Sequence, residues 1–251
     1  MRNALDIRVK DIELRFPSLP AAFDGYRLLH IADPHLGLFP GLTERIIEIA
    51  SSIDADLCVM TGDYRPSWRT PVGHVIPALE ALVASLRRPD GVVAVLGNHD
   101  PQELVGPLQR MGVTVLAHSV VSIARDGARI EILGVDDRLY RTTRSGRRVL
   151  ADATGDFVVA LVHSPRYAET ARGSRVNFYL CGHTHAGQVC LPGGIAVWRP
   201  RGCGTRMAGR WRVGTMQGYT SAGAGVSVLP VRFNCPGEIT RITLRRGEET
   251  R

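Results

Sequence analysis

Short apolar runs recur along the chain and alternate with stretches in which apolar residues follow a helical period. The runs have the length of buried strands and end in small polar clusters. They cover residues 26–32, 57–61, 92–96, 113–117, 157–162 and 177–181. Apolar residues share one helical face within 46–53 and again within 75–86. Strands that alternate with helices predict parallel pairing through right-handed crossovers.

The second half of the chain adds antiparallel and irregular segments. Residues 120–135, VVSIARDGARIEILGV, predict a hairpin closed by Asp126 and Gly127, a pair typical of tight β-turns. Beyond Cys190 the chain is rich in Gly, Pro and Arg, with short β segments such as 238–244. No repeat or long linker divides the sequence. We therefore predict one mixed-sheet α/β domain over residues 1–251.

Composition predicts a folded protein with a basic surface. The hydrophobic fraction of 44% is ordinary for a globular chain and argues against disorder. A formal net charge of +7 favours an anionic partner, such as nucleic acid, a phosphorylated substrate or an acidic membrane. Lys10 is the only lysine, however, and so uniform a use of arginine is explained equally well by nucleotide bias in the genome.

The cysteines and the first residues indicate the compartment. The five cysteines form an odd set with neither a C-x-x-C pair nor zinc-ribbon spacing, which predicts reduced, buried thiols and a cytoplasmic location. Residues 1–16 carry charges throughout and contain no apolar run long enough for a signal peptide or a membrane span. We expect a soluble protein, or one peripheral to the inner face of the membrane.

Polar residues directly after the predicted strands carry the candidate chemistry. In chain order they are Asp33-Pro34-His35, Gly62-Asp63, Gly97-Asn98-His99-Asp100, His163 and Gly182-His183-Thr184-His185. Ligands of open α/β sheets bind beyond the carboxyl ends of the strands. Asp-x-His alone is a weak signal, because it is common in capped turns, and Gly-Asp is weaker, because Asp there commonly caps the next helix. Gly-Asn-His-Asp is a better signal, because it offers an amide oxygen, a proton donor and an orienting carboxylate in direct succession. Their joint occurrence at strand ends favours one shared site, whereas His30, inside a strand, is interpreted as a core or supporting histidine.

The residue types in these loops match a pair of metal ions. Carboxylate and amide oxygens with neutral imidazole suit Mn²⁺, Fe²⁺ or Zn²⁺, and the absence of cysteine argues against a structural zinc site. Seven ligands are too many for one tetrahedral ion and fit two ions bridged by a carboxylate. The predicted ligands are Asp33, His35, Asp63, Asn98, His163, His183 and His185. Two metal ions held in this way clamp the attacking and leaving oxygens of a displacement at phosphorus, which predicts a phosphoesterase.

The ordered motifs DPH, GD, GNHD, H and GHTH resemble those of the calcineurin-like metallophosphoesterase superfamily, over residues 33–185. The resemblance implies a metallo-dependent phosphatase-like fold, a four-layer α/β/β/α sandwich with two mixed sheets. It implies Asp33, His35 and His185 as ligands of one ion, Asn98, His163 and His183 as ligands of the other, and Asp63 as the bridge. We expect both ions to be Mn²⁺, with Fe²⁺ or Zn²⁺ as alternatives.

The same resemblance assigns roles to two residues that are not ligands. His99 would approach the phosphate and protonate the leaving oxygen or stabilise the transition state, and Asp100 would orient the His99 ring. The nucleophile would be a hydroxide that bridges the ions, with no covalent intermediate on the enzyme.

A narrower resemblance concerns residues 181–192, CGHTHAGQVCLP, and residues 221–239, SAGAGVSVLPVRFNCPGEI. They look like the branch that includes bacterial membrane-lipid phosphodiesterases and one class of UDP-2,3-diacylglucosamine pyrophosphohydrolase. The resemblance implies a phospholipid or a nucleotide-linked lipid as substrate. The sequence departs from the branch at Ala186, where Gly is usual, at Pro34, where Leu is commoner, and in lacking a membrane-spanning N-terminus.

Two arginine-rich stretches are candidates for substrate contact. One runs from Arg138 to Arg148, and the other contains Trp198, Arg199, Arg201, Arg206, Arg210, Trp211 and Arg212. Arginine with tryptophan suits a loop on an anionic membrane, a site for single-stranded nucleic acid, or a merely solvated loop. We expect Trp68, Arg206 and Arg232 to contact the substrate.

The leading interpretation is therefore hydrolysis of a P–O bond in a phospholipid or nucleotide-linked lipid. The alternative enzyme is a phosphodiesterase acting on soluble cyclic nucleotides or nucleic acid. Two further alternatives are a phosphate-binding protein without activity and a membrane-associating module. A non-catalytic protein predicts the loss of a ligand or of His99, and the sequence retains all of them. The sequence leaves the metal, the substrate and the oligomeric state open.

Overall fold

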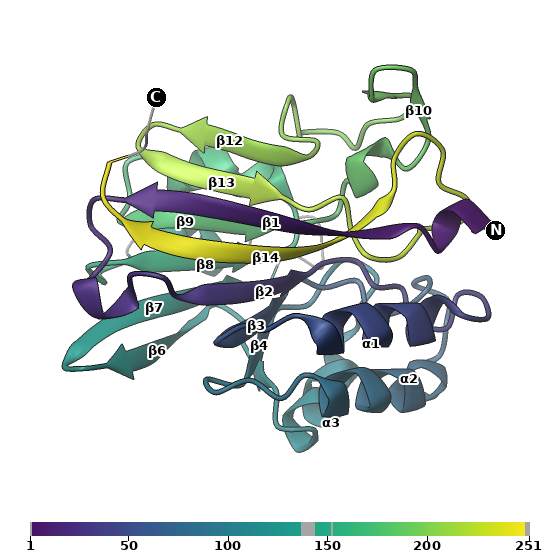
Figure 1. Cartoon of the computed structure of the whole chain (residues 1–251), viewed down its shortest axis with the longest axis horizontal. Coiled ribbons are helices and arrows are strands. Elements are labelled where there is room, and N and C mark those ends of the chain that lie inside the picture. The colour runs from purple at the N-terminus through teal and green to yellow at the C-terminus, as the bar shows by residue number, and fades with distance from the viewer. Residues whose placement is uncertain (1, 137–143, 152, 249–251) are drawn as a thin grey trace.

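The computed structural model describes residues 2–136, 144–151 and 153–248, and two six-stranded sheets form its centre (Figure 1). In spatial order, the first sheet contains β1 (Ile7–Phe16), β14 (Gly237–Arg246), β2 (Arg27–Ile31), β3 (Leu57–Met60), β4 (Val92–Ala94) and β5 (Thr114–Val115). The second contains β12 (Gly209–Val213), β13 (Met216–Thr220), β9 (Val176–Cys181), β8 (Val158–Val162), β7 (Ala128–Val135) and β6 (Ser119–Arg125). Both sheets are mixed, because β14–β2, β6–β7 and β12–β13 pair antiparallel and the other neighbours pair parallel.

Helices cover the outer faces of the two sheets. The first sheet carries α1 (Leu42–Ser52), α2 (Val72–Ser85) and α3 (Val105–Arg110), and the second carries α4 (Arg144–Ala151) with the 3-10 segment Pro165–Ala171. A short hairpin of β10 (Cys190–Leu191) and β11 (Ile195–Ala196) lies outside both sheets. The predicted four-layer α/β/β/α sandwich with two mixed sheets is confirmed.

Alternating side chains on the central strands build three apolar layers. In β2, Leu28 packs between the two sheets while Leu29 packs under the helices of the first sheet. In β3, Val59 likewise packs between the two sheets, and Met60 packs under the helices of the first sheet. Successive residues of a strand point to opposite faces, so strands covered on both sides need apolar residues at every position. The continuous apolar runs in the sequence reflect this double burial.

The sequence predicted most of the inner strands and missed an edge strand. The predicted hairpin appears as β6 and β7, whereas the strand expected at 113–117 is reduced to the two residues of β5. Strand β1 pairs with β14 over ten residues, although its sequence IRVKDIELRF is charged throughout. Half of its side chains are exposed, so the strand lacks the apolar run by which the inner strands were identified.

Within the described ranges, no helix combines the length and the apolar character needed to cross a membrane.

Candidate dimetal site

Five loops bring the seven predicted ligands together where the carboxyl edges of the two sheets meet. Asp33 and His35 follow β2, Asp63 follows β3 and Asn98 follows β4, all in the first sheet. The remaining three follow strands of the second sheet, His163 after β8 and His183 and His185 after β9. The site therefore depends on the packing of one sheet against the other.

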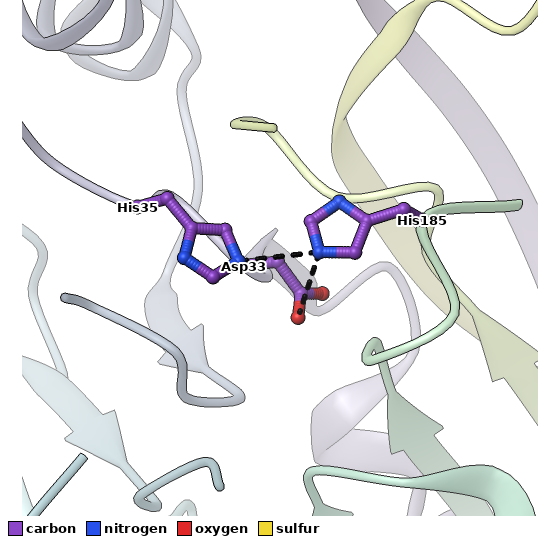
Figure 2. A group of neighbouring side chains, drawn as sticks. All are labelled: Asp33, His35 and His185. Carbon is purple, nitrogen blue, oxygen red and sulfur yellow. Dashed lines mark hydrogen bonds and ion pairs between the residues drawn. The ribbon is translucent and has the colours of Figure 1, made fainter. Parts of the chain in front are cut away.

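Three of these residues form one cluster of possible metal ligands, shown in Figure 2. Asp33, His35 and His185 are buried, and one ligand atom from each lies within 4.8 Å of the others. His35 Nε2 is 3.2 Å from His185 Nε2, which is 3.8 Å from Asp33 Oδ1. His35 Nδ1 donates a hydrogen bond to the Arg65 carbonyl at 2.7 Å. Because a carbonyl only accepts, Nε2 of His35 keeps its lone pair for a metal.

A second cluster lies next to the first. Asp63, His163 and His183 also place ligand atoms within 4.8 Å of one another. His163 Nε2 is 2.9 Å from Asn98 Oδ1, 3.2 Å from His183 Nδ1 and 3.3 Å from Asp63 Oδ2. His163 Nδ1 donates to the Thr61 carbonyl at 2.8 Å, so this Nε2 also carries its lone pair toward the cluster.

Asp63 lies between the two clusters. Its Oδ2 is 3.3 Å from His163 Nε2 in one cluster and 3.9 Å from His35 Nε2 in the other. Its Oδ1 accepts the backbone N–H of His99 at 2.8 Å, which fixes the carboxylate in this position. One carboxylate that faces two groups of ligands has the placement that a bridging ligand requires.

The electrostatics of the site suit divalent cations. Burial lowers the pKa of His35 to about 4 and that of His183 to about 3, so both rings are neutral at neutral pH. Burial, followed by the charge of Asp63, raises the pKa of Asp33 to about 7, although His163 lowers it. Two buried carboxylates repel each other unless cations lie between them. The donor set of neutral imidazoles and confined carboxylates therefore fits metal ions.

The backbone of the site is strained at the predicted ligands. Positive φ angles occur at Asp33 (48°), His35 (42°), Asp63 (58°), His183 (70°) and His185 (49°). The left-handed region costs a residue with a side chain about 1–2 kcal/mol, and such residues gather at functional sites. Five of the seven predicted ligands share this strain, which marks the loops as shaped for ligand placement.

Comparison with known proteins agrees with this geometry. The family model for calcineurin-like phosphoesterases matches residues 26–187. The chain belongs to this family. It is 32% identical over 243 residues to the uncharacterized metallophosphoesterase YkuE of Bacillus subtilis, an alignment that covers 90% of this chain and 82% of YkuE. It is 28% identical over 228 residues to the phosphodiesterase YaeI of Escherichia coli, covering 87% of this chain and 82% of YaeI.

A longer relative comes from zebrafish. The transmembrane protein with metallophosphoesterase domain of Danio rerio is 30% identical over 269 residues. The alignment covers 95% of this chain but 57% of the zebrafish protein, so the chain spans little more than half of that relative. The family resemblance read from the motifs is confirmed, and the chain is a metal-dependent phosphoric ester hydrolase.

In this calcineurin-like phosphoesterase, Asp100 takes a role different from the predicted one. It was expected to orient the His99 ring. Instead its carboxylate accepts the backbone N–H groups of Asp63 at 2.7 Å and of Tyr64 and Gly97 at 2.9 Å each. Within the described chain, His99 Nδ1 is buried and has no hydrogen-bond partner. Asp100 therefore joins the loops after β3 and β4 and supports the Asp63 backbone.

Two glycines of the phosphoesterase motifs leave room for the carboxylates. A Cβ on Gly97 would lie 2.8 Å from Asp63 Cγ, and a Cβ on Gly182 would lie 3.1 Å from Asp33 Cγ and 2.7 Å from the Ala32 Cβ. In both cases the nearest carboxylate oxygen would be closer still. The Gly before Asn98 and the Gly before His183 are therefore steric requirements of the ligand positions.

Arg232 is not placed to meet a substrate, which corrects the sequence prediction. Its side chain is 1% exposed, and its guanidinium donates to the carbonyls of Ala222 at 2.7 Å, Gly223 at 2.9 Å and Gly225 at 2.6 Å. It also lies 3.4 Å from His185 Nδ1. A buried arginine whose donors meet backbone carbonyls shapes the loop behind His185. Burial contributes most to lowering the pKa of His185, followed by His35 and then by the positive charge of Arg232.

Of the other two predicted substrate residues, one is exposed and one is half-buried. Trp68 is exposed, with the Arg69 guanidinium 4.6 Å from its ring centroid. Arg206 forms an ion pair with Glu169 and lies 5.6 Å from the Trp211 ring centroid. Of the first arginine-rich stretch, Arg138 and Arg141 lie outside the described residues. Substrate contact by Trp68 and Arg206 stays a prediction.

An apolar groove that was not predicted from the sequence lies beside His185. The groove has a volume of about 370 Å³, with Thr184 and His185 among its lining and aliphatic residues from two loops making much of the rest. The aliphatic residues at 195–197 and 228–231 are the only sign of the groove in the sequence, and several arginines separate the two segments. Only the fold shows that these segments meet beside a candidate ligand.

Proposed function

We propose that this calcineurin-like phosphoesterase is a dimetal phosphodiesterase or pyrophosphohydrolase whose substrate is a phospholipid or a nucleotide-linked lipid. The observation that carries the proposal is the position of Asp63 between two ligand clusters, with an apolar groove beginning at His185 of the first cluster. The clusters suit a phosphoryl group, and the groove suits an apolar part of the same molecule. The diesterase assignment draws further support from the similarity to YaeI, a named phosphodiesterase.

The proposed ligand division follows the clusters. Asp33, His35 and His185 would hold one ion, and Asn98, His163 and His183 would hold the other, with Asp63 facing both. Bound there, two divalent ions would polarise the phosphoryl oxygens and make water a better nucleophile near neutral pH. We propose Mn²⁺, because oxygen and imidazole donors suit it, with Fe²⁺ and Zn²⁺ as alternatives.

His99 is proposed as the proton donor to the leaving oxygen. Its Nε2 is 3.8 Å from Asp63 Oδ2, and its ring lies edge-on to that of His35 with centroids 5.2 Å apart. The ring is thus beside the clusters without belonging to either of them. Its side chain is 15% exposed, which leaves an edge open to a substrate. A general acid needs this combination of proximity and access.

We also propose a cytoplasmic location with peripheral contact to the inner face of the membrane. All five cysteines are buried and none of them forms a disulfide, as expected of a protein in a reducing compartment.

The diesterase assignment is tested with protein reconstituted with Mn²⁺. It should hydrolyse bis-p-nitrophenyl phosphate faster than p-nitrophenyl phosphate, and the reverse ranking would reject a diesterase. A second screen compares phospholipids, UDP-diacylglucosamine and cyclic nucleotides. Turnover of cyclic nucleotides alone would reject the lipid substrate.

Variants separate the proposed roles of Asp63 and His99. Asp63→Ala should abolish turnover and reduce metal content. His99→Ala should keep both metals and lower kcat by about 10²–10⁴-fold, the usual contribution of a general acid. His74→Ala is the matched control, because His74 is exposed on α2. Loss of metal in His99→Ala would show that His99 is a ligand.

A further inference from the structure

Exposed apolar side chains gather on two loops of the molecule. Among the described residues, eleven large hydrophobic side chains are exposed, and eight of them lie in 191–198 and 228–233. Trp198 is 66% exposed and Val228 is 78% exposed. The other six are Leu191, Ile195, Val197, Leu229, Val231 and Phe233. We name these two segments together the two-loop surface.

Hydrogen bonds hold the two loops side by side. The Cys190 N–H donates to the Phe233 carbonyl at 2.9 Å, and the Phe233 N–H donates to the Gln188 carbonyl at 3.0 Å. The Gln188 side-chain amide donates to the carbonyls of Ser227 at 2.9 Å and Leu229 at 3.1 Å. Figure 1 shows β10 and the segment leading to β14 at the end of the molecule where the N-terminus lies. The exposed side chains thus belong to an ordered, continuous surface.

The two-loop surface begins at the candidate metal centre. The apolar groove of about 370 Å³ is lined by Thr184 and His185 together with Trp198, Val228 and Leu229. His185 is a member of the first ligand cluster. A ligand that covers the two-loop surface therefore reaches the edge of the proposed reaction site.

Charge identifies the kind of partner that this surface fits. Between His185 and Glu238 the sequence contains no Asp or Glu, and it contains six arginines. Arg199 and Arg201 are exposed directly after Trp198. Apolar side chains with arginines and one tryptophan match a bilayer that carries anionic headgroups, where tryptophan lies at headgroup depth. A second copy of the same surface would instead bring arginines against arginines.

We propose that the two-loop surface docks on an anionic phospholipid bilayer and turns the candidate metal centre toward the lipid. Trp198 lies at the level of the headgroups, Leu229 and its aliphatic neighbours enter the acyl region, and Arg199 and Arg201 face anionic headgroups. The proposal rests on the proposed function for its lipid substrate. Docking itself requires no catalysis, so the two can fail separately.

Flotation with vesicles tests the docking. The full chain, reconstituted with Mn²⁺, is mixed with vesicles of phosphatidylcholine alone or with added phosphatidylglycerol, at low and high salt. It should float with the anionic vesicles and much less with neutral ones, and high salt should weaken the binding. Leu229→Glu should lower binding at least tenfold. The double variant Arg199→Gln with Arg201→Gln should lower binding about 25-fold, because each arginine contributes about fivefold.

Val120→Glu is the matched control, because Val120 is exposed on β6, an edge strand of the second sheet, whereas the two-loop surface belongs to neither large sheet. It should float with anionic vesicles and hydrolyse bis-p-nitrophenyl phosphate as the unchanged protein does. No flotation with either vesicle, or equal binding by Leu229→Glu, would overturn the docking. If the protein self-associates but does not float, and Leu229→Glu abolishes the self-association, the two-loop surface binds a second copy of the chain instead of a bilayer. If the diester is still hydrolysed in those cases, the dimetal function stands.

Discussion

A methyl group at residue 97 would occupy the space in which the Asp63 carboxylate lies. The Cβ of an alanine there would be 2.8 Å from Asp63 Cγ, whereas non-bonded carbons settle at about 3.5–4.0 Å. The carboxylate must therefore move by about 1 Å. The loop itself has little room to retreat, because a Cβ on Gly62 would already meet the Gly97 Cα at 2.6 Å.

The size of the effect follows from this displacement. Overpacking a filled site costs about 1–3 kcal/mol of unfolding free energy. A misplacement of about 1 Å at a reacting centre costs about 100-fold in rate. Because Asp63 Oδ2 faces both clusters, we expect Gly97→Ala to lose metal from both as well.

The assay combines three measurements on protein reconstituted with Mn²⁺. Urea unfolding gives the free energy, elemental analysis gives the metal content, and initial rates on bis-p-nitrophenyl phosphate give kcat. Gly73→Ala is the matched control, since Gly73 lies in α2 with no heavy atom within 4 Å of an added Cβ. That variant should be as stable as the original protein or more so. Full metal content and unchanged turnover in Gly97→Ala would refute the placement of Asp63 between two ions.

Three further substitutions test the surroundings of the site. Asp100→Asn should lower the unfolding free energy by about 2–4 kcal/mol, because an amide NH₂ would face backbone N–H donors, and unchanged urea unfolding would contradict this. Arg232→Met should cost about 3 kcal/mol by leaving buried carbonyls without donors. The KM of Arg232→Met for the diester should be unchanged. A raised KM with intact stability would show that Arg232 contacts the substrate after all. Burial lowers the pKa of His30 to about 4, so the unfolded chain binds more protons between pH 6.5 and 4, and stability falls as pH falls through that window. At pH 5 this loss amounts to about 2 kcal/mol of unfolding free energy, and His30→Gln should not show it. If the unfolding free energies of the two proteins fall in parallel as the pH is lowered, the burial effect on His30 is contradicted.

Most of the inner strands could be predicted because burial on both faces leaves a strong local pattern. Strands β3 and β8 are apolar at every position, and each is followed by a polar ligand. Strand β1 could not be recognised in the same way, because half of its side chains are exposed and its pairing with β14 joins residues more than two hundred positions apart. That pairing is a property of the whole sheet and leaves little trace in the local sequence.

The sequence by itself determined which residue types stand at the strand ends, and hence the family and the metal-dependent chemistry. Tertiary structure decided which of them meet. His35 and His185 are 150 residues apart, and their nitrogens come within 3.2 Å only because the two sheets pack face to face. The same packing decided that Arg232 is buried and that Asp100 serves the backbone. Residue type is local information and can be read from the chain. Burial and hydrogen-bond partners depend on segments that are distant in the sequence, so they could not be predicted from the chain alone.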